Sequence, residues 1–190
     1  MQGVIHKKIR LLAISGSLRA ASYNTALLRA AILLAPDDVE IIFYSNMVNL
    51  PLFNPDLDGN EPDLVLNFRQ LIASVDGLLI ASPEYAHGVS GVMKNALDWL
   101  VSGEEFVGKP VALYNTSPRA SHAYAALQEI ISVMSAYIVN EACISVALLG
   151  TQLDATGIVA HPEIAQSMRQ SLLDFTRAIS NSTSSVPAGD

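Results

Sequence analysis

The stretch IRLLAISGSLRAASYNTALLR, residues 9–29, decides the fold. Its first part, Ile9 to Ile14, is an apolar run typical of a buried strand. The run stops at Ser15-Gly16-Ser17, and helix-period apolar residues follow from Ala26. The order is therefore strand, short hydroxyl-rich loop, helix. Such a loop gathers backbone N–H groups and hydroxyls at the positive end of a helix dipole, an arrangement that suits a phosphate group.

The loop differs from two common phosphate-binding motifs. It has no Gly-Lys-Ser/Thr of a Walker A loop, and Gly16 is the only glycine where a dinucleotide fingerprint needs three. A terminal monophosphate fits better, because hydroxyls and N–H groups would satisfy its oxygens and Arg19 would add charge-assisted bonds. The alternative is an ordinary strand-to-helix turn in which Ser22 or Asn24 only caps the helix.

The placement of charge favours an anion site. The formal net charge is −7, yet the first acidic residue is Asp37, so all 18 acidic side chains follow residue 36. An anion site in an acidic protein needs a local region without negative charge, as residues 1–36 provide. The overall negative charge argues against nucleic acid or an anionic membrane as a partner.

Composition predicts one domain over residues 1–180 and a disordered tail over 181–190. No apolar run approaches the ~20 residues of a membrane span, and the N-terminus does not read as a signal peptide. The single cysteine, Cys143, excludes an internal disulfide and lies in an apolar segment, so we expect an inert, buried thiol. These observations predict a cytoplasmic protein. Hydrophobic residues make up 51% and charged residues only 15%, a balance that favours a buried interface between copies of the chain.

Strand-like runs alternate with helix-period stretches along the chain. The alternation predicts βαβ units and a parallel sheet covered on both faces. We expect a flavodoxin-like, doubly wound, five-stranded α/β sheet in the order 2-1-3-4-5, with ligands bound beyond the C-terminal strand ends. The expected strands are 9–14, 39–44, 77–81, 110–114 and 143–148, and the expected helices are about 23–35, 62–74, 90–102, 121–136 and 161–180.

A second cluster of site residues follows the third strand, in SPEYAHGVSGVMKNALDWL, residues 82–100. Tyr85 and His87 are flat side chains among small residues, which leaves room for a planar ligand beside the phosphate loop. The alternative makes both ordinary loop residues. Trp99 falls near the margin of the apolar stripe of the next helix, where we expect a subunit contact. A third loop, residues 115–122, reaches the same sheet edge, where Arg119 meets either an anionic ligand or a surface carboxylate.

With these motifs, GSLRAASYN (16–24) and PEYAHGVSGVMKNALDWL (83–100), the chain resembles the NADPH-dependent FMN reductase family. A loop carrying LPLFNPDL (50–57) also matches in place. The resemblance implies a flavodoxin-like fold, bound FMN, NADPH or NADH as hydride donor, and a homodimer or homotetramer with flavin near the subunit interface. It also implies the cofactor-binding residues: Ser15, Ser17, Arg19, Ser22, Asn24 and Thr25 at the phosphate, Pro83, Glu84, Tyr85, Ala86, His87 and Gly88 at the isoalloxazine ring, and Ser117 near the ring or ribityl chain.

Three positions depart from the family pattern. Ala86 stands where the family commonly has Asn, and Ser90 where it commonly has Pro. The loop Ser117–His122 lacks the usual glycines. The loss of the Asn side chain removes a polar contact to the ring, which bears on FMN affinity and redox potential. The bulkier third loop bears on access for the nicotinamide or the acceptor.

We therefore expect an FMN-dependent NAD(P)H oxidoreductase that passes electrons to a small-molecule acceptor such as a quinone, free flavin or azo compound by a ping-pong mechanism. The chemistry would lie on the flavin, so no catalytic side chain is expected. The alternative is a flavodoxin-like electron carrier or redox-sensing FMN binder. A serine hydrolase is disfavoured because no G-x-S-x-G occurs, and a metal site because the four histidines show no ligand spacing.

Overall fold

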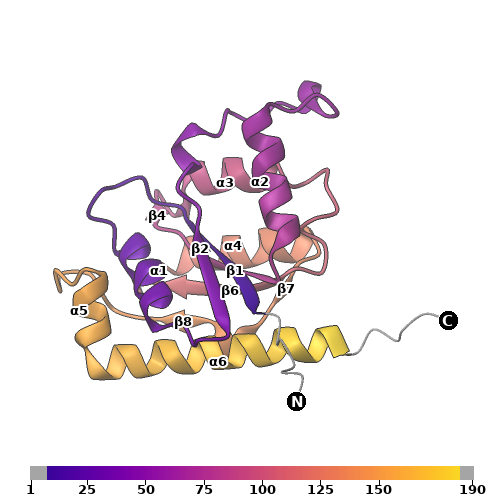
Figure 1. The fold of residues 1–190 in the computed structure, drawn as a ribbon. Coiled ribbons are helices and arrows are strands. Elements are labelled where there is room, and N and C mark those ends of the chain that lie inside the picture. Colours follow the sequence, from indigo (N-terminus) through magenta and orange to yellow (C-terminus); the bar gives the residue numbers. More distant parts are fainter. Residues whose placement is uncertain (1–7, 185–190) are drawn as a thin grey trace, which may run out of the picture.

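A parallel sheet forms the centre of the molecule, and the computed structural model describes residues 8–184 of it. The strand order is β2-β1-β3-β6-β7, and β8 also pairs with β6 (Figure 1). This order confirms the predicted flavodoxin-like, doubly wound arrangement. The strands are β1 (Ile9–Ser15), β2 (Val39–Phe43), β3 (Gly77–Ala81), β6 (Pro110–Asn115), β7 (Tyr137–Ile138) and β8 (Ile144–Ser145).

The fifth strand position is divided, where the sequence predicts one strand over 143–148. β7 pairs with the start of β6 and β8 with its end. Between them lies a 3₁₀ turn, η3 (Asn140–Ala142), whose Ala142 is fully buried. The Ser171 hydroxyl donates to the Ala142 carbonyl at 2.5 Å, so a contact from the C-terminal helix fixes this interruption.

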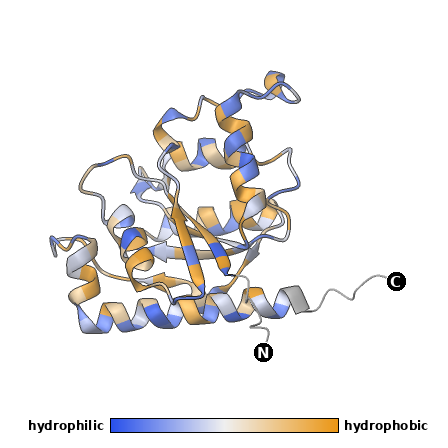
Figure 2. Ribbon diagram, viewed as in Figure 1, coloured by the Kyte–Doolittle hydropathy of each residue, from blue (hydrophilic) through white to orange (hydrophobic). Residues whose placement is uncertain are grey.

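Helices cover both faces of the sheet. α1 (Tyr23–Leu34), α5 (Ala155–Ala160) and α6 (Pro162–Ser184) pack on one face. α2 (Asp63–Ser74), α3 (Gly91–Asp98) and α4 (Ser121–Val133) pack on the other. Successive side chains of β1 alternate between the two cores, with Leu11 in the first and Leu12 in the second. Figure 2 shows the matching hydropathy, with apolar central strands and helices that are polar on one side.

The C-terminal helix is longer than predicted. The sequence predicts a helix over 161–180 and a disordered tail from residue 181, but α6 continues to Ser184. The rest of that tail, residues 185–190, lies outside the described residues. α5 was not predicted at all; it is a six-residue helix that Asp154 caps by accepting from the Gly157 N–H. Among residues 8–184, no helix has the length and apolar character needed to cross a membrane.

The long segment between β2 and α2 lies against α3. It contains two 3₁₀ turns, η1 (Met47–Asn49) and η2 (Pro55–Leu57). The Pro51 carbonyl accepts from Trp99 Nε1 at 2.8 Å and from Asn95 Nδ2 at 2.9 Å. Trp99 is only 2% exposed, so its expected role as a subunit contact was wrong: its indole holds this loop from within.

Candidate functional site

The loop after β1 folds around its own hydroxyls. Ser22 caps α1, because its Oγ accepts from the Thr25 N–H at 3.2 Å. The Ser15 hydroxyl lies 2.9 Å from Thr25 Oγ1 and also accepts from the Ser17 N–H. These bonds hold the backbone of residues 15–25 in one shape at the start of a twelve-residue helix. The positive end of that helix faces the same loop.

A close approach joins this loop to the segment after β3. The Gly16 N–H donates to the Ala81 carbonyl, and Ser90 Oγ donates to the Gly16 carbonyl at 2.6 Å. A Cβ on residue 16 would lie 2.5 Å from Ser82 Oγ and 2.8 Å from Ser90 Oγ, so a side chain there would displace both hydroxyls. Ser90 is 2% exposed, and its Oγ also accepts from the Met93 N–H at the start of α3. One hydroxyl therefore joins the first loop to the third-strand segment.

Residues 84–89 form a tight hairpin where the sequence predicts an open loop. β4 (Glu84–Tyr85) pairs antiparallel with β5 (Gly88–Val89). The two turn residues both adopt left-handed backbone, Ala86 at φ 49° and His87 at φ 60°. Turns of this kind favour Asn-Gly, and each L-residue other than Gly costs about 1 kcal/mol there. Ala-His carries no hairpin signal, so this turn depends on contacts made elsewhere.

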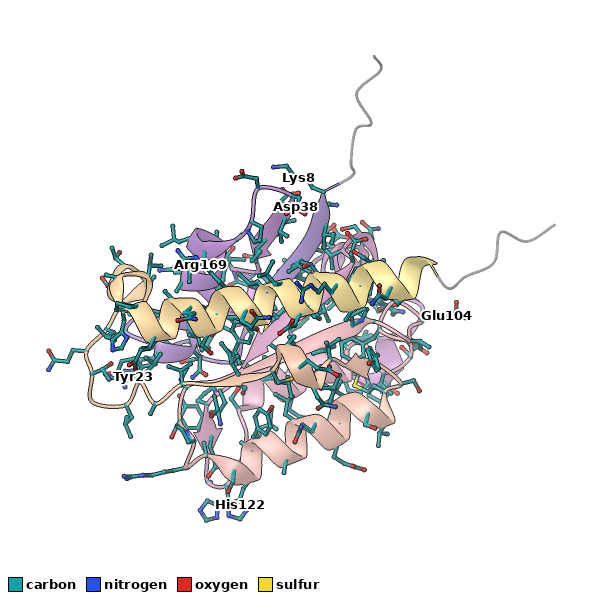
Figure 3. The ribbon with its side chains drawn as sticks, turned by 90° about the horizontal axis from the view of Figure 1, so that it is seen from below. Lys8, Tyr23, Asp38, Glu104, His122 and Arg169 are labelled. Atoms are coloured by element: carbon teal, nitrogen blue, oxygen red, sulfur yellow. The ribbon has the colours of Figure 1, made fainter. Side chains whose placement is uncertain are left out.

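Those contacts come from the start of α4. Glu84 Oε2 accepts from the Ala123 N–H at 2.9 Å, so a carboxylate from the hairpin satisfies a free amide in the first turn of that helix. The His87 ring stacks on the His122 ring with centroids 4.4 Å apart and planes 17° apart. Figure 3 shows His122 at the edge of the molecule, at the start of α4. The hairpin is thus fixed to the third loop at two points.

The loop after β6 completes the sheet edge. Thr116 Oγ1 donates to Asn24 Oδ1 at 3.3 Å, and both residues are buried. The Ser117 N–H donates to Asn115 Oδ1, which closes the first turn of this loop. The loops after β1, β3 and β6 are therefore joined, as predicted from the strand order.

The predicted site residues fall into two groups. In the first group, the side-chain oxygens form hydrogen bonds that hold the loops together; these residues are Ser15, Asn24 and Glu84. Their contact with a cofactor stays a prediction. The second group has exposed side chains and contains Arg19 and Tyr85, of which Tyr85 is 58% exposed. The sequence analysis did not assign a role in the site to Ser90, Thr116 and His122. Only Ser90 carried a signal, as a serine at the start of the helix predicted over 90–102.

The charges of the site suit an anion. Among residues 8–184 no ion pair involves Arg19. Neither does that part of the chain hold a group of three or more His, Cys, Asp or Glu residues able to bind a metal. Burial raises the pKa of the Cys143 thiol, which accepts from the Leu113 N–H, so this cysteine is a poor nucleophile.

These residues fit FMN. A loop of hydroxyls with an unpaired arginine at a helix N-terminus suits its phosphate. A hairpin with an exposed tyrosine, fixed beside that loop, suits its planar ring. The fold and the site together define a flavodoxin-like, flavin-binding class of protein.

Comparison with known proteins is consistent with this class. Residues 9–148 match the family model of NADPH-dependent FMN reductase. An NAD(P)H-dependent FMN reductase of Pseudomonas aeruginosa is 33% identical over 170 residues, which is 86% of this chain and 91% of the relative. A 2-hydroxy-1,4-benzoquinone reductase of a Burkholderia species is 32% identical over 88% of this chain and 92% of the relative. Among solved structures, the flavoenzyme NAD(P)H:(acceptor) oxidoreductase FerB of Paracoccus denitrificans superposes with a TM-score of 0.74 at 25% identity, over 91% of this chain and 98% of that chain.

The chain belongs to the NADPH-dependent FMN reductase family. It is an FMN-dependent oxidoreductase with NAD(P)H as the hydride donor.

Proposed function

We propose that this chain is a quinone-type reductase that holds the FMN phosphate on residues 15–25 and the isoalloxazine ring against the hairpin 84–89. The observation that carries the proposal is the joining of three loops at one sheet edge, where Arg19 forms no ion pair with any of residues 8–184. The named activities of two relatives, an FMN reductase and a benzoquinone reductase, support a small aromatic acceptor.

The protein's part in the reaction is binding and placement. Bound FMN would accept a hydride from the nicotinamide cofactor and pass two electrons to the acceptor. Arg19 would bind the phosphate, and Ser17, Ser22 and Thr25 would line the same loop. The hairpin would set the position of the ring, since Glu84 and His87 fix the hairpin to α4. Because both substrates would use one face of the ring, turnover would follow a ping-pong pattern.

Removal of Arg19 tests the phosphate assignment. Arg19→Ala should weaken FMN binding about tenfold or more, since a charge-assisted bond is lost, while the melting temperature of the apoprotein stays unchanged. The readout is FMN affinity by fluorescence titration. Arg169→Ala on α6, another exposed arginine, is the control and should bind FMN normally (Figure 3). Equal FMN affinity in wild type and Arg19→Ala would overturn the assignment.

We also propose that two copies of the chain associate through the segment 46–60 and the end of α3. Val48, Leu52 and Val101 are exposed apolar side chains there, and Leu52 is 84% exposed. Hydrogen bonds from Asn95 and Trp99 to the Pro51 carbonyl attach the segment to α3. Leu52→Asp should give a monomer by sedimentation, with Leu33→Asp on α1 as a matched control. A dimer unaffected by Leu52→Asp would count against this surface.

A cytoplasmic location completes the proposal. Support comes from the single cysteine and from the use of NAD(P)H as donor.

A further inference from the structure

A cavity of about 550 Å³ lies between the start of α1 and the segment 152–156, which leads into α5. That volume is in the range of small-molecule sites. Three of its lining residues, Arg19, Ser22 and Thr25, are residues that we place at the FMN phosphate. A phosphate group alone would fill only a small part of it. The cavity therefore contains the proposed phosphate position and further space beyond it.

This further space lies away from the proposed position of the flavin ring. The hairpin 84–89 is attached to α4 through Glu84 and His87. α4 packs on one face of the sheet, whereas α1 and α5 pack on the other. A ligand whose ring rests on the hairpin and whose phosphate lies on the loop 15–25 therefore points its phosphate end toward the cavity.

Arg29 is a charged group that borders the space beyond the phosphate. It follows Thr25 by four residues, so the two side chains lie one turn apart on the same face of α1, with about 5–6 Å between their Cβ atoms. The Arg29 guanidinium lies over the Phe43 ring, 5.5 Å from its centroid, which steadies the group without neutralising its charge. Within residues 8–184 Arg29 forms no ion pair. A cation in this position suits a second phosphate bonded to the first.

The rest of the lining suits an adenosine. The small side chains of Ala26 and Ala155 leave room for a flat ring, and Gln152 and Thr156 offer hydrogen bonds. The Gln152 N–H donates to a tyrosine hydroxyl of α1 at 3.3 Å and closes one side of the cavity (Figure 3). Among the described lining residues Asp154 is the one carboxylate, and it is engaged as the cap of α5. Two guanidinium groups against one carboxylate favour an anionic ligand.

We propose that the chain binds flavin adenine dinucleotide (FAD) as well as FMN, with the adenylate of FAD in this cavity and Arg29 on its second phosphate. FAD is FMN with adenosine monophosphate bonded to its phosphate, so the added group begins where FMN ends. The inference rests on the proposed placement of the FMN phosphate on residues 15–25. The two flavins share the residues that bind the first phosphate, and FAD alone uses Arg29.

Fluorescence titration of the full-length apoprotein with each flavin tests the proposal. The wild type should bind FAD with an affinity within about tenfold of that for FMN. Arg29→Ala should weaken FAD binding about tenfold, because a charge-assisted bond is lost, and change FMN affinity less than about twofold. Arg169→Ala on α6 should leave both affinities unchanged. A wild type that binds FAD more weakly than this would overturn the proposal, and so would an Arg29→Ala variant in which FAD affinity is unchanged or both affinities fall equally.

A second variant fills the cavity without removing a charge. Thr156 is an exposed residue of the α5 wall, so Thr156→Trp should occupy the adenylate space while the melting temperature of the apoprotein stays unchanged. It should weaken FAD binding about fivefold or more and leave FMN affinity unchanged. Equal FAD affinity in wild type and Thr156→Trp would contradict the proposal.

Arg19→Ala separates the adenylate site from the phosphate placement on which it rests. This variant should weaken the binding of both flavins, because both would use Arg19 for the first phosphate. If it weakens neither, the placement of the phosphate is wrong. If it weakens both while Arg29→Ala leaves FAD affinity unchanged, the placement stands and the adenylate site is rejected.

Discussion

Replacement of Ser90 tests how the loops of the site are joined. Its hydroxyl donates to the Gly16 carbonyl at 2.6 Å and accepts from the Met93 N–H at 3.4 Å. Ser90→Ala removes a helix cap, which costs about 1 kcal/mol, and leaves the carbonyl of a buried residue without its donor, which costs about 1–3 kcal/mol. We expect the free energy of unfolding to fall by about 2–4 kcal/mol.

Ser90→Pro separates the contribution of the hydroxyl to stability from that of the backbone conformation. The backbone at residue 90, φ −58° and ψ 144°, already has the geometry that proline prefers. Proline would lose the same bonds but recover about 0.4–1 kcal/mol through the unfolded state. The variant should therefore be less destabilised than Ser90→Ala. The two substitutions therefore compare two ways of holding the same turn.

Urea unfolding of the apoprotein is the assay, with FMN titration beside it. Ser82→Ala is the matched control, because the Ser82 hydroxyl makes only long bonds, at 3.3 Å to Ser90 Oγ and 3.4 Å to the Pro83 carbonyl. It should cost less than about 0.5 kcal/mol. If Ser90→Ala unfolds within about 0.5 kcal/mol of wild type, the reasoning is refuted and the loops are held by other contacts.

Two further predictions concern local strain and an unpartnered hydroxyl. Ala86→Asn should stabilise the apoprotein by about 0.5–1 kcal/mol, because Asn tolerates left-handed backbone better, and should tighten FMN binding if the ring lies at the hairpin; an unchanged urea midpoint contradicts the first part, and unchanged FMN affinity contradicts the second. Tyr44→Phe should stabilise by about 1 kcal/mol at pH 7, because the buried Tyr44 hydroxyl has no hydrogen-bond partner among the described residues. Burial raises the pKa of Tyr44 to about 12, above its unfolded value near 10, because the folded state disfavours the phenolate. The effect of this titration on stability is therefore absent below pH 10, and stability is lost as pH rises from 10 through 12. Unfolding at pH 7, 10 and 12 should show a smaller alkaline loss for Tyr44→Phe than for wild type, and equal losses would count against this account.

The fold was predictable wherever it depends on local pattern. The change from an apolar run at Ile9–Ile14 to a helical period at Ala26 reports directly on strand and helix. The division of the fifth strand was not predictable, because η3 depends on Ser171. That residue lies 29 positions from the carbonyl that it binds. The hairpin was missed for a similar reason: Ala86-His87 has no turn signal, and Glu84 finds its partner at Ala123, 39 positions away.

The joining of the three loops was predictable, and the roles of their side chains were less so. Strand order brings three loops to one edge, so the junction between the loop that carries Arg19 and the segment that carries Tyr85 follows from topology. The choice between a side chain that binds a ligand and one that holds a loop depends on long-range partners. Asn24 pairs with Thr116 and Gly16 with Ser90, 92 and 74 positions apart, and no pattern in the sequence marks such pairs.

The attachment of the hairpin to α4 has a consequence for redesign. Glu84 and His87 bind the same helical turn that ends the loop Pro118–His122. Replacements made in that loop to admit a bulkier acceptor would therefore also change the hairpin on which we propose that the flavin rests. Acceptor range and redox potential are properties that an engineer would wish to tune separately, and with the flavin placed as proposed a single pair of contacts would make them vary together.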